Sequence, residues 1–356
     1  MSDNPHKFWN KQPVGVEEGA NSLISHPNKI PTEEYKLPEG CVFENITDYK
    51  ELSKFLSENY VEDIDNEFRL IYSESFFSWF INNPKHCPEY SLGLKFNNCL
   101  IGYIFGKETA ISINGLTQKV AAINFLCVIK SKRNRRISPI LIKEITRRFN
   151  CNGIYSGIFT AGTPLFFKIS TAKYWHKPIN TKKLITSGFL DRPVDVSLPC
   201  ARSSTRLLKE EDIMICYKLY KNDIQKYKLV DDMDEDDFRH FINNKIMRVY
   251  VNEVDGVINS FGTYFVLDTM SIKKNQRISS AYLNLICGDC VKTMIEDLIY
   301  FSAQEKCDVF NSINIGEAGK YLEELDFLEG SGELNYYLYN WKSGVIDKNQ
   351  IFYYMH

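Results

Sequence analysis

The residues best suited to chemistry lie in a basic segment that follows an apolar one. Five basic residues lie within seven consecutive positions, namely Lys130, Lys132, Arg133, Arg135 and Arg136. The Ser138–Pro139 pair after them is typical of a helix start, with serine as the N-cap and proline in the first turn. Because the N–H groups of a first turn lack helical partners, cations beside them favour a multiply charged anion such as a diphosphate. A solvated basic loop or a nucleic-acid patch would use the same residues, so this segment alone leaves all three open.

Two elements must position that segment. Residues 123–129 are almost continuously apolar, which is the pattern of a central strand covered on both faces. Leu141, Ile142, Ile145 and Phe149 then recur at helical spacing, so we expect a helix from Ser138 onward. A strand that leads through a basic turn into a helix would present the cations at the end of a sheet.

Composition narrows the class of protein. The chain has 356 residues, 44% of them hydrophobic, so two domains are expected. Its formal net charge of -2 does not support a nucleic-acid binder. The ten cysteines are scattered, and the single C-x-x-C pair, Cys287 and Cys290, has no histidine cluster nearby. Buried reduced thiols are therefore favoured over zinc, and a cytoplasmic location is expected. No apolar stretch reaches membrane-spanning length, and the polar start does not resemble a signal peptide.

The predicted elements occur twice in the same order of helix, helix, hairpin, strand, helix and strand. In the first half the expected ranges are helices 48–60, 73–80 and 138–149 and strands 91–96, 100–106, 123–129 and 154–160, with a turn at Asn97–Asn98. In the second half they are helices 209–227, 235–243, 290–304 and 318–325 and strands 248–253, 257–267, 281–287, 308–313 and 334–342, with a turn at Asp255–Gly256. We therefore expect two α/β halves with joined sheets, 1–190 and 191–356, and a linker at 191–205, which has two prolines and no periodicity.

Several segments resemble N-myristoyltransferases (glycylpeptide N-tetradecanoyltransferases), in order along nearly the whole chain. The segments are KFWNKQPV at Lys7, NYVEDIDNEFRLIYS at Asn59, INFLCVIKSKRNRRISPILIKEITRR at Ile123, TAG at Thr160, YWH at Tyr174, DVFN at Asp308 and YYLYNWK at Tyr336. The resemblance implies a tandem pair of acetyltransferase-like (GNAT-type) halves with pseudo-twofold symmetry and a joined central sheet. It also implies transfer of myristate from myristoyl-CoA to the N-terminal glycine of proteins, by a monomer with no metal, no prosthetic group and no nucleic-acid or integral-membrane role.

The same resemblance implies which residues bind the co-substrate. In the family, the first half binds myristoyl-CoA, and the second half contributes the peptide groove and the catalytic C-terminus. The positions that match the CoA contacts are Lys7, Phe8, Trp9, Phe125, Leu126, Cys127, Val128, Arg133, Asn134, Arg135, Arg136, Ile137, Ser138 and Pro139. An N-terminal arm that packs on the core would also account for Phe8 and Trp9.

Catalysis by this family implies a backbone oxyanion hole at Phe125 and Leu126. Such a hole requires the strand to break its ladder there, because paired amides could not reach an acyl oxygen. The family's base is the C-terminal carboxylate, here that of His356, whose imidazole is a rival base. Asn124 and Thr160 would orient the amine or relay its proton, although Thr160 is also consistent with an ordinary strand-end threonine.

The peptide groove is implied in the same way, with departures. The matching positions are Asp63, Asp65, Phe68, Arg69, Tyr72, Gly162, Tyr174, His176, Tyr282, Asn311 and Ser331. Ile64 interrupts the family's run of aspartates, and Ser331 replaces the acid of its G-D-G-N-L motif, so a preference for a basic substrate residue is expected to be weaker. A short-chain N-acetyltransferase or a non-catalytic binding protein are the alternatives.

Overall fold

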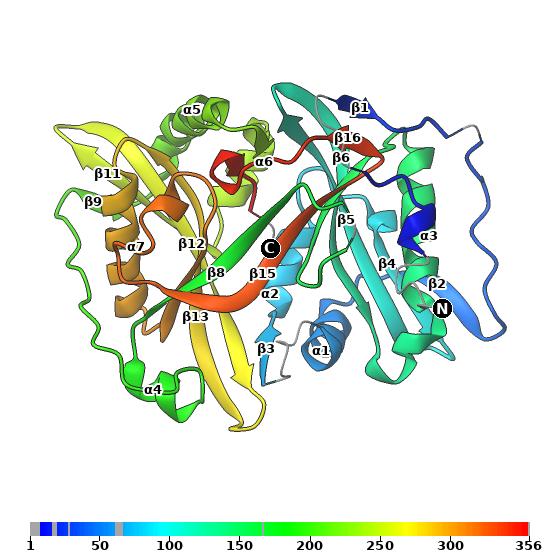
Figure 1. Cartoon of the computed structure of the whole chain (residues 1–356), viewed down its shortest axis with the longest axis horizontal. Helices are drawn as coiled ribbons and strands as arrows, with labels where there is room; N and C mark the ends of the chain where they lie inside the picture. The colour runs from blue at the N-terminus through cyan, green and yellow to red at the C-terminus, as the bar shows by residue number, and fades with distance from the viewer. Residues whose placement is uncertain (1–7, 16–19, 28, 61–66, 166, 355–356) are drawn as a thin grey trace.

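The computed structural model describes residues 8–15, 20–27, 29–60, 67–165 and 167–354. A sheet of 15 strands runs through both halves of the molecule, and a separate pair joins β1 to β16 (Figure 1). The strands are β1 Asn21–Leu23, β2 Cys41–Asn45, β3 Phe68–Ile71, β4 Ser91–Phe96, β5 Cys99–Ile113, β6 Leu116–Val128, β7 Gly157–Ala161, β8 Ser170–Pro178, β9 Thr205–Leu207, β10 Leu229–Asp231, β11 Met247–Val254, β12 Val257–Ser271, β13 Gln276–Gly288, β14 Val309–Ile313, β15 Leu328–Tyr339, β16 Trp341–Ser343 and β17 Ile351–Phe352. The α-helices are α1 Tyr49–Asn59, α2 Glu74–Ile81, α3 Ile137–Cys151, α4 Thr181–Thr186, α5 Ile213–Asp223, α6 Glu235–Ile242 and α7 Val291–Gln304.

Tight turns with positive φ connect the hairpin strands. Asn97 and Asn98 join β4 to β5 with φ of 47° and 62°, and Asp255 and Gly256 join β11 to β12 with φ of 51° and 77°. Asparagine, aspartate and glycine tolerate this left-handed region, which two-residue hairpins need in order to follow the twist of the strands. Both turns were expected from the sequence, and both are confirmed.

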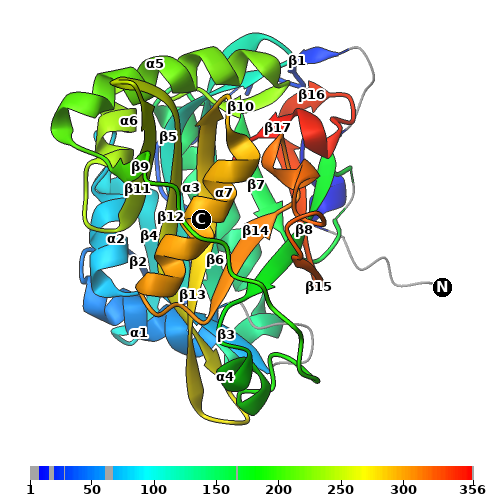
Figure 2. The same ribbon diagram turned by 90° about the vertical axis from the view of Figure 1, so that its left-hand side faces the viewer.

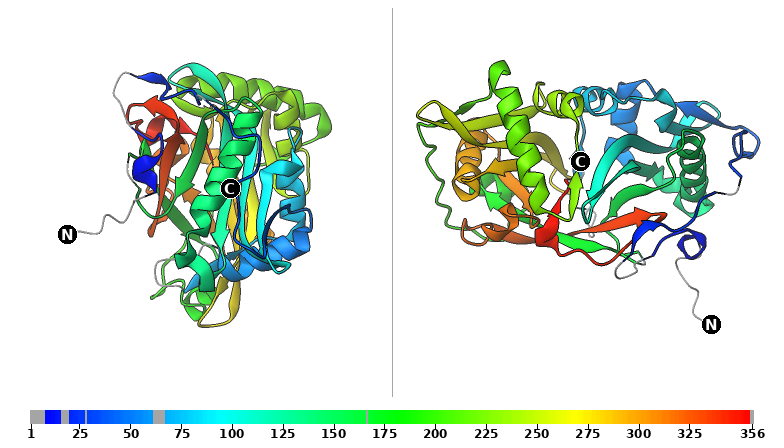
Figure 3. Two further views of the ribbon diagram at one scale, coloured as in Figure 1. Left: turned by 90° about the vertical axis from the view of Figure 1, so that its right-hand side faces the viewer. Right: turned by 90° about the horizontal axis from the view of Figure 1, so that it is seen from above.

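The two halves repeat one arrangement. In the first, β6 leads through α3 into β7, which pairs with β6 in parallel; in the second, β13 leads through α7 into the parallel β14. Figures 2 and 3 show α7 and α3 lying against the strands of their own halves. The mixed α/β fold with two acetyltransferase-like halves is thus confirmed.

Exchange of strands joins the sheets of the two halves. Strand β15, from late in the chain, pairs with β7 and β8, and β8 in turn pairs with β14. In Figure 1 these two long strands cross the middle of the molecule between the halves. The joined sheet places residues 157–178 against residues 309–339, which are far apart in the sequence.

Several predicted boundaries were wrong. The helix expected at 209–227 is broken into a 3-10 turn, α5 and a second 3-10 turn, and at 318–325 only a short 3-10 helix, Ala318–Lys320, is present. Ser138 is not an N-cap, because α3 already begins at Ile137 and Arg136 is its N-cap in the left-handed region. Strands β3, β8, β9 and β10 were missed, since they are short or lack clean alternation. The predicted linker has no helix or strand before β9 begins at Thr205.

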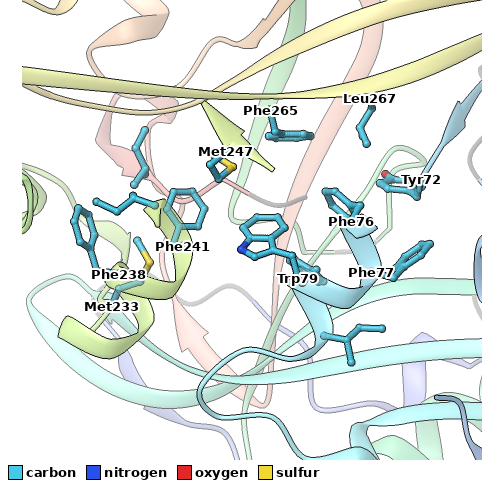
Figure 4. Close-up of a cluster of buried hydrophobic side chains, with 14 of the residues drawn as sticks. Tyr72, Phe76, Phe77, Trp79, Met233, Phe238, Phe241, Met247, Phe265 and Leu267 are labelled. Atoms are coloured by element: carbon cyan, nitrogen blue, oxygen red, sulfur yellow. The ribbon is translucent and has the colours of Figure 1, made fainter. Parts of the chain in front are cut away.

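The largest hydrophobic cluster lies between the two halves. Figure 4 shows the side chains of α2, including Phe76, Phe77 and Trp79, facing Phe265 of β12 and Phe241 of α6. The ring of Phe76 lies 6.1 Å from that of Phe265, and the ring of Trp79 lies 6.0 Å from that of Phe241. Because this core spans both halves, the geometry between them is fixed by buried aromatic packing.

Candidate active site

A β-bulge interrupts strand β6 at the predicted oxyanion hole. Tyr103 of β5 is opposite Cys127, but Phe105 is opposite Asn124, so Phe125 and Leu126 together oppose the single residue Ile104. Phe125 has a φ of 55°, in the left-handed region that a bulky residue rarely adopts. The ladder is therefore broken where a backbone oxyanion hole requires it to be.

The Phe125 side chain holds this strained backbone in place. It is 1% exposed and packs edge-on against Tyr72, Phe77 and Phe80, with ring centroids 5.3 to 5.5 Å apart. These three partners lie on or just before α2. Burial of a large aromatic side chain is favourable by more than the cost of one left-handed residue, so core packing maintains the bulge.

The Tyr60 hydroxyl lies beside the Phe125 backbone N–H. Burial strongly raises the pKa of Tyr60, and the neighbouring N–H of Phe125 opposes this rise. Tyr60 caps the C-terminal end of α1, and its ring lies 5.7 Å from that of Phe125. The N–H of Phe125 is thus directed out of the sheet ladder toward a side chain.

Asn124 and Thr160 lie where strands β6 and β7 stop pairing. The parallel register runs from Ala121 opposite Gly157 to Ile123 opposite Phe159, so Asn124 and Thr160 are the first residues beyond it. The following turn is held by the buried Asn335, whose amide donates to the carbonyls of Ala161 at 3.1 Å and Gly162 at 3.3 Å. The two polar residues expected near the substrate amine therefore share one strand end, beside the bulge.

The basic segment forms a 3-10 helix, Lys130–Arg135, directly before α3. Arg136 in the left-handed region turns the chain, and Ile137, Ser138 and Pro139 form the first turn of α3. Proline is tolerated there because its missing N–H would have no acceptor within the helix. Although Arg136 and not Ser138 is the cap residue, the N-terminus of α3 lies where a site for an anion was predicted.

Several of the basic residues make contacts within the protein. Arg133 donates from Nη2 to the carbonyl of Asn59 at 2.6 Å, and the Asn59 side chain accepts from the N–H of Lys130 at 3.1 Å. The Lys132 ammonium lies 5.0 Å above the ring of Phe96. The remaining predicted contacts of the segment, Asn134, Arg135 and Arg136, are exposed. Asn59 at the end of α1 therefore anchors the basic turn.

The N-terminal arm packs on strand β7. Trp9 stacks on Phe159 at 5.3 Å, and Phe8 contacts Trp9 edge-on at 5.2 Å. Phe159 in turn stacks on Tyr337 of β15 at 5.1 Å. The arm is thus attached to the residue directly before Thr160. Lys7, also predicted to contact CoA, lies outside the described residues.

Cys127 lies two residues after Phe125 and is buried beside Val128. Burial raises the pKa of the Cys127 thiol to about 12, although Arg133 and Lys130 oppose the rise. The thiolate is therefore scarce near neutral pH, and a covalent acyl-cysteine at this residue is disfavoured.

The predicted peptide residues of the two halves meet across β13, β14 and β8. Tyr282, Asn311 and His176 occupy neighbouring positions on these three strands. His176 donates from Nδ1 to Asn311 Oδ1 at 2.7 Å, and burial lowers its pKa, so the ring is held neutral. Phe189 lies edge-on to both His176, at 5.3 Å, and Phe68, at 5.6 Å. Among the other predicted groove residues, Tyr72 is buried and Arg69 donates to the Ser57 carbonyl at 3.0 Å.

A bulge in β15 carries the G-S-G-E-L segment. Glu329 is opposite Trp175 and Glu333 is opposite Lys173, so residues 330–332 together oppose Tyr174. A Cβ at Gly330 would lie 2.3 Å from His176 Nε2, and one at Gly332 would lie 3.2 Å from the Tyr174 ring. Ser331 is exposed between them. The two glycines allow the bulge to lie directly on predicted groove residues.

The C-terminal segment runs into the centre of the molecule. Strand β17 pairs in parallel with β10, and the Tyr336 hydroxyl donates to the carbonyl of Tyr353 at 2.9 Å. Figure 3 shows this strand between the two halves. The predicted base, His356, and the two predicted acids of the peptide groove, Asp63 and Asp65, lie outside the residues that the structure describes.

A cavity of about 60 Å³ lies between the halves, next to this segment. Asn124 lines it from β6, Asn284 and Leu285 line it from β13, and residues 352–354 line it from the C-terminal segment. Asn284 and Leu285 also mark a register shift of β13 against β12, because they lie opposite the step from Gly262 to Tyr264. The two halves therefore carry corresponding bulges. The catalytic candidates are therefore connected to a polar interior.

Sequence reasoning missed four residues that shape the site: Asn59, Tyr60, Asp231 and Asn335. Asn59 and Tyr60 begin the NYVED segment already used for the resemblance, and Asn335 precedes YYLYNWK, so a signal was present for these three. Asp231 belongs to an acidic run at residues 231–237, and no local pattern separates it from its neighbours.

Within the described ranges, no group of three His, Cys, Asp or Glu side chains could hold a metal ion. A search of the same residues finds no helix with the length and apolarity needed to cross a membrane. The arrangement combines an anion-binding helix N-terminus, a broken strand with a redirected N–H and a polar strand end. Such a site can polarise a carbonyl attached to a phosphate-bearing carrier and deliver it to an amine.

Solved structures resemble the chain along almost its full length. The crystal structure of Saccharomyces cerevisiae N-myristoyltransferase with bound myristoyl-CoA matches with a TM-score of 0.92 and 26% identity, over 99% of this chain and 100% of that one. A GCN5-related N-acetyltransferase from Anabaena variabilis matches with a TM-score of 0.51 and 10% identity, over 84% and 72% of the two chains, which shows likeness of fold alone.

Comparisons of the sequence with known proteins lead to the same family as the solved structures. The chain is 34% identical to the glycylpeptide N-tetradecanoyltransferase of Plasmodium falciparum, over 97% of this chain and 92% of that protein. It is 32% identical to the probable glycylpeptide N-tetradecanoyltransferase of Caenorhabditis elegans, over 97% and 84%. The models of the N-terminal and C-terminal domains of myristoyl-CoA:protein N-myristoyltransferase match residues 22–172 and 194–352. The chain therefore belongs to the N-myristoyltransferase family and is an acyltransferase.

Proposed function

We propose that this protein transfers myristate from myristoyl-CoA to the N-terminal glycine of proteins. The observation that carries the proposal is the bulge at Phe125 and Leu126, which redirects a backbone N–H directly before a basic helix N-terminus. Membership of the family gives the acyl donor and acceptor classes, and the bulge gives the place where the thioester carbonyl is polarised.

The co-substrate is held by the start of α3. The N–H groups of Ile137 and Ser138 bind the CoA diphosphate, with Arg135 and Arg136 as exposed cations beside them. The segment between these N–H groups and the bulge is only residues 126–136, so a diphosphate bound at α3 directs the CoA chain along the end of β6. Arg133 contributes mainly by fixing the turn, since its guanidinium already binds the Asn59 carbonyl.

The thioester oxygen accepts from the N–H groups of Phe125 and Leu126. In the free protein, the Phe125 N–H faces the Tyr60 hydroxyl, and the acyl oxygen takes the place of this hydroxyl when the co-substrate binds. As the glycine nitrogen attacks, negative charge develops on this oxygen, and preoriented N–H donors stabilise that charge more than they stabilise the ground state.

A base must first remove a proton, because an α-amino group has a pKa of about 7.7 to 8.0 and arrives mostly protonated. We assign this role to the C-terminal carboxylate of His356, with Thr160 and Asn124 orienting the amine. The described part of the C-terminal segment supports this, since its pairing with β10 and the Tyr336 bond lead the chain inward beside Asn124. Transfer is direct, in keeping with the high pKa of the Cys127 thiol.

The groove between β8, β13, β14 and β15 accepts the peptide. His176, held neutral by burial, can bond a small substrate hydroxyl, and Tyr174 and Tyr282 line the path. We further propose that residues 1–190 bind the co-substrate and residues 191–356 supply the peptide groove and the catalytic terminus. The repeated β6–α3–β7 and β13–α7–β14 units support this division.

A release assay for CoA tests the function. Turnover is expected with myristoyl-CoA and a Gly-initiated peptide, and not with an Ala-initiated peptide of the same sequence. Equal turnover of acetyl-CoA would favour a short-chain acetyltransferase instead. Binding of myristoyl-CoA without turnover of any Gly-initiated peptide would favour a non-catalytic binding protein.

Two C-terminal variants test the base. Deletion of Met355 and His356 removes the proposed base, so we expect turnover to fall by about 100-fold or more while myristoyl-CoA still binds. His356→Ala keeps a C-terminal carboxylate and should lose much less. If the deletion left turnover unchanged, the carboxylate would have no part in the mechanism, and if His356→Ala were as damaging, the imidazole would be the base.

A further inference from the structure

The cavity beside Asn124 is partly open and has both polar and apolar walls. Its volume of about 60 Å³ has room for roughly four water molecules, at about 15 Å³ for each. Trp79, Met233 and Phe241, labelled in Figure 4, form part of its apolar wall. Its polar lining consists of Lys107, Thr109, Asn124, Asp231, Asp237 and His240 together with Asn83 and Asn284.

Asp231 is the acid of this cavity that lies beside the C-terminal segment. Val230 is opposite Phe352 in the β10–β17 pair, so Asp231 follows at the level of Tyr353. Asp231 is half-buried and lines the cavity. Its side chain accepts from the Thr109 hydroxyl at 2.9 Å, and its carbonyl accepts from the Tyr220 hydroxyl.

Asp231 differs from Asp237, the other acid of the cavity, in having no ion pair among the residues that the structure describes. Asp237 is bound by the Lys85 ammonium at 2.5 Å, and its Oδ1 is buried with no hydrogen-bond partner in the described ranges. His240 donates from Nε2 to the Trp79 carbonyl at 2.9 Å, and burial lowers its pKa, so it holds a proton poorly.

The charges around Asp231 set its proton affinity. Burial raises the pKa of the Asp231 carboxyl, and the Lys107 ammonium and the Thr109 hydroxyl limit the rise. The charged and titratable groups that face it are Lys107 on β5, Asp237 and His240 on α6, Lys85 after α2, Tyr220 on α5 and Tyr353 in the C-terminal segment. An enclosed carboxylate with one hydroxyl donor is suited to take up and release a proton.

The reaction proposed above releases one proton in each cycle. A glycine ammonium and a thioester become an amide, a thiol and one proton: the ammonium loses two protons, the departing sulfur takes one, and the other must leave the site. The base that takes the first proton has to be deprotonated again before the next substrate binds. This proton therefore needs an acceptor on its way from the reacting groups to solvent.

We propose that the cavity is the exit route for this proton and that Asp231 is its acceptor. This inference rests on the proposed function. The proton passes from the base over water held in the cavity to the Asp231 carboxylate, where an O–H bond forms, and leaves from there to solvent. Asn124 orients the chain of hydrogen bonds at the substrate end, and Thr109 orients the Asp231 carboxylate. Asp231 does not touch the substrate, and it acts as a positioning and proton-holding residue.

The test compares Asp231→Asn with the wild type across pH. The variant keeps the shape of the side chain and an acceptor for Thr109, but it cannot take up a proton. We expect kcat at pH 6.5 to fall by about tenfold or more, with KM for the peptide unchanged. At pH 9 the loss should be less than about twofold, because the glycine amine then arrives neutral and no net proton is released. A merely structural defect would lower kcat by the same factor at every pH.

Asp232→Asn is the matched control, since Asp232 is the adjacent carboxylate and is bound by Lys221 and Thr117 outside the cavity. Its pH profile should match that of the wild type. An Asp231→Asn profile that parallels the wild type at all pH values would overturn the inference, while wild-type turnover would still support the proposed function. No turnover by the wild type would overturn both.

Thr109→Val is a second variant, for the case in which Asp231→Asn fails to bind myristoyl-CoA. It removes the hydroxyl that stabilises the Asp231 carboxylate, so the pKa of Asp231 should rise further. We expect the acidic limb of kcat to move to higher pH while activity at pH 9 is retained. An acidic limb at the wild-type position would contradict the role of Asp231.

Discussion

The Tyr336 hydroxyl donates a 2.9 Å hydrogen bond to the carbonyl of Tyr353, and both residues are buried. Tyr336 is also the cross-strand neighbour of Thr160. One tyrosine therefore connects the strand that carries Thr160 to the segment that ends in the proposed base.

Tyr336→Phe should uncouple these two parts of the site. The Tyr353 carbonyl would be left buried without this donor, so the free energy of unfolding is expected to fall by about 1 to 3 kcal/mol. We expect kcat to fall while the affinity for myristoyl-CoA stays the same, as measured by peptide turnover and by calorimetric titration.

Tyr339→Phe is the control on the same strand. Its hydroxyl donates to Gln12 at 3.3 Å in a half-buried setting, so the loss of stability should be smaller. If Tyr336→Phe kept full kcat, the hydrogen bond would serve stability alone.

The left-handed backbone of Phe125 predicts an unusual ranking of two substitutions. Phe125→Ala removes a fully buried ring and should destabilise the protein by about 3 to 5 kcal/mol. Phe125→Gly removes the same ring but adopts a φ of 55° without strain, so it should be about 1 kcal/mol more stable than the alanine variant. At an ordinary strand position alanine is the more stable of the two. Chemical denaturation of both variants measures the ranking, and the ordinary order would mean that the bulge is lost in solution.

Tyr60→Phe tests whether an acyl oxygen replaces the Tyr60 hydroxyl. The variant removes the hydroxyl that faces the Phe125 N–H in the free protein, which should cost about 1 kcal/mol of stability. Binding of myristoyl-CoA restores a partner, so the rise in melting temperature on adding it should be larger than for the wild type.

Tyr103→Phe serves as the comparison, because its buried hydroxyl bonds Ser91 at 3.0 Å. That variant should lose stability equally with and without myristoyl-CoA. An identical ligand-induced shift in Tyr60→Phe and the wild type would show that the acyl oxygen does not reach the Phe125 N–H.

His176 should make stability depend on pH. Burial lowers its pKa in the folded protein below the unfolded value of about 6.5. The unfolded chain therefore binds the proton more readily, so the contribution to stability is present above pH 6.5 and is lost as the pH falls through the folded-state pKa.

His176→Gln retains a donor for Asn311 but does not titrate. Unfolding measured between pH 7 and pH 5 should show a shallower loss of stability in this variant, with the remaining slope due in part to His240. An unchanged slope would mean that His176 is not held neutral in the folded protein.

The sequence by itself determined the repeated order of elements, the hairpin turns at Asn97–Asn98 and Asp255–Gly256, and the basic segment before α3. These features depend on local properties, namely apolar periodicity, turn residues with positive φ and the spacing of charges. The segments with family resemblance, the longest of them at residues 123–148, also identified the family, which the comparisons confirm.

Only the tertiary structure decided how these parts meet. The exchange of β8 and β15 between the halves depends on pairing between distant residues, which no local pattern encodes. The bulge at Phe125 depends on aromatic packing from α2, and the placement of Asp231 depends on β10 lying beside β17. In the sequence Asp231 is one acid in a run of acids. In the fold its neighbours form ion pairs and it lines a cavity, because burial is a property of the assembled elements.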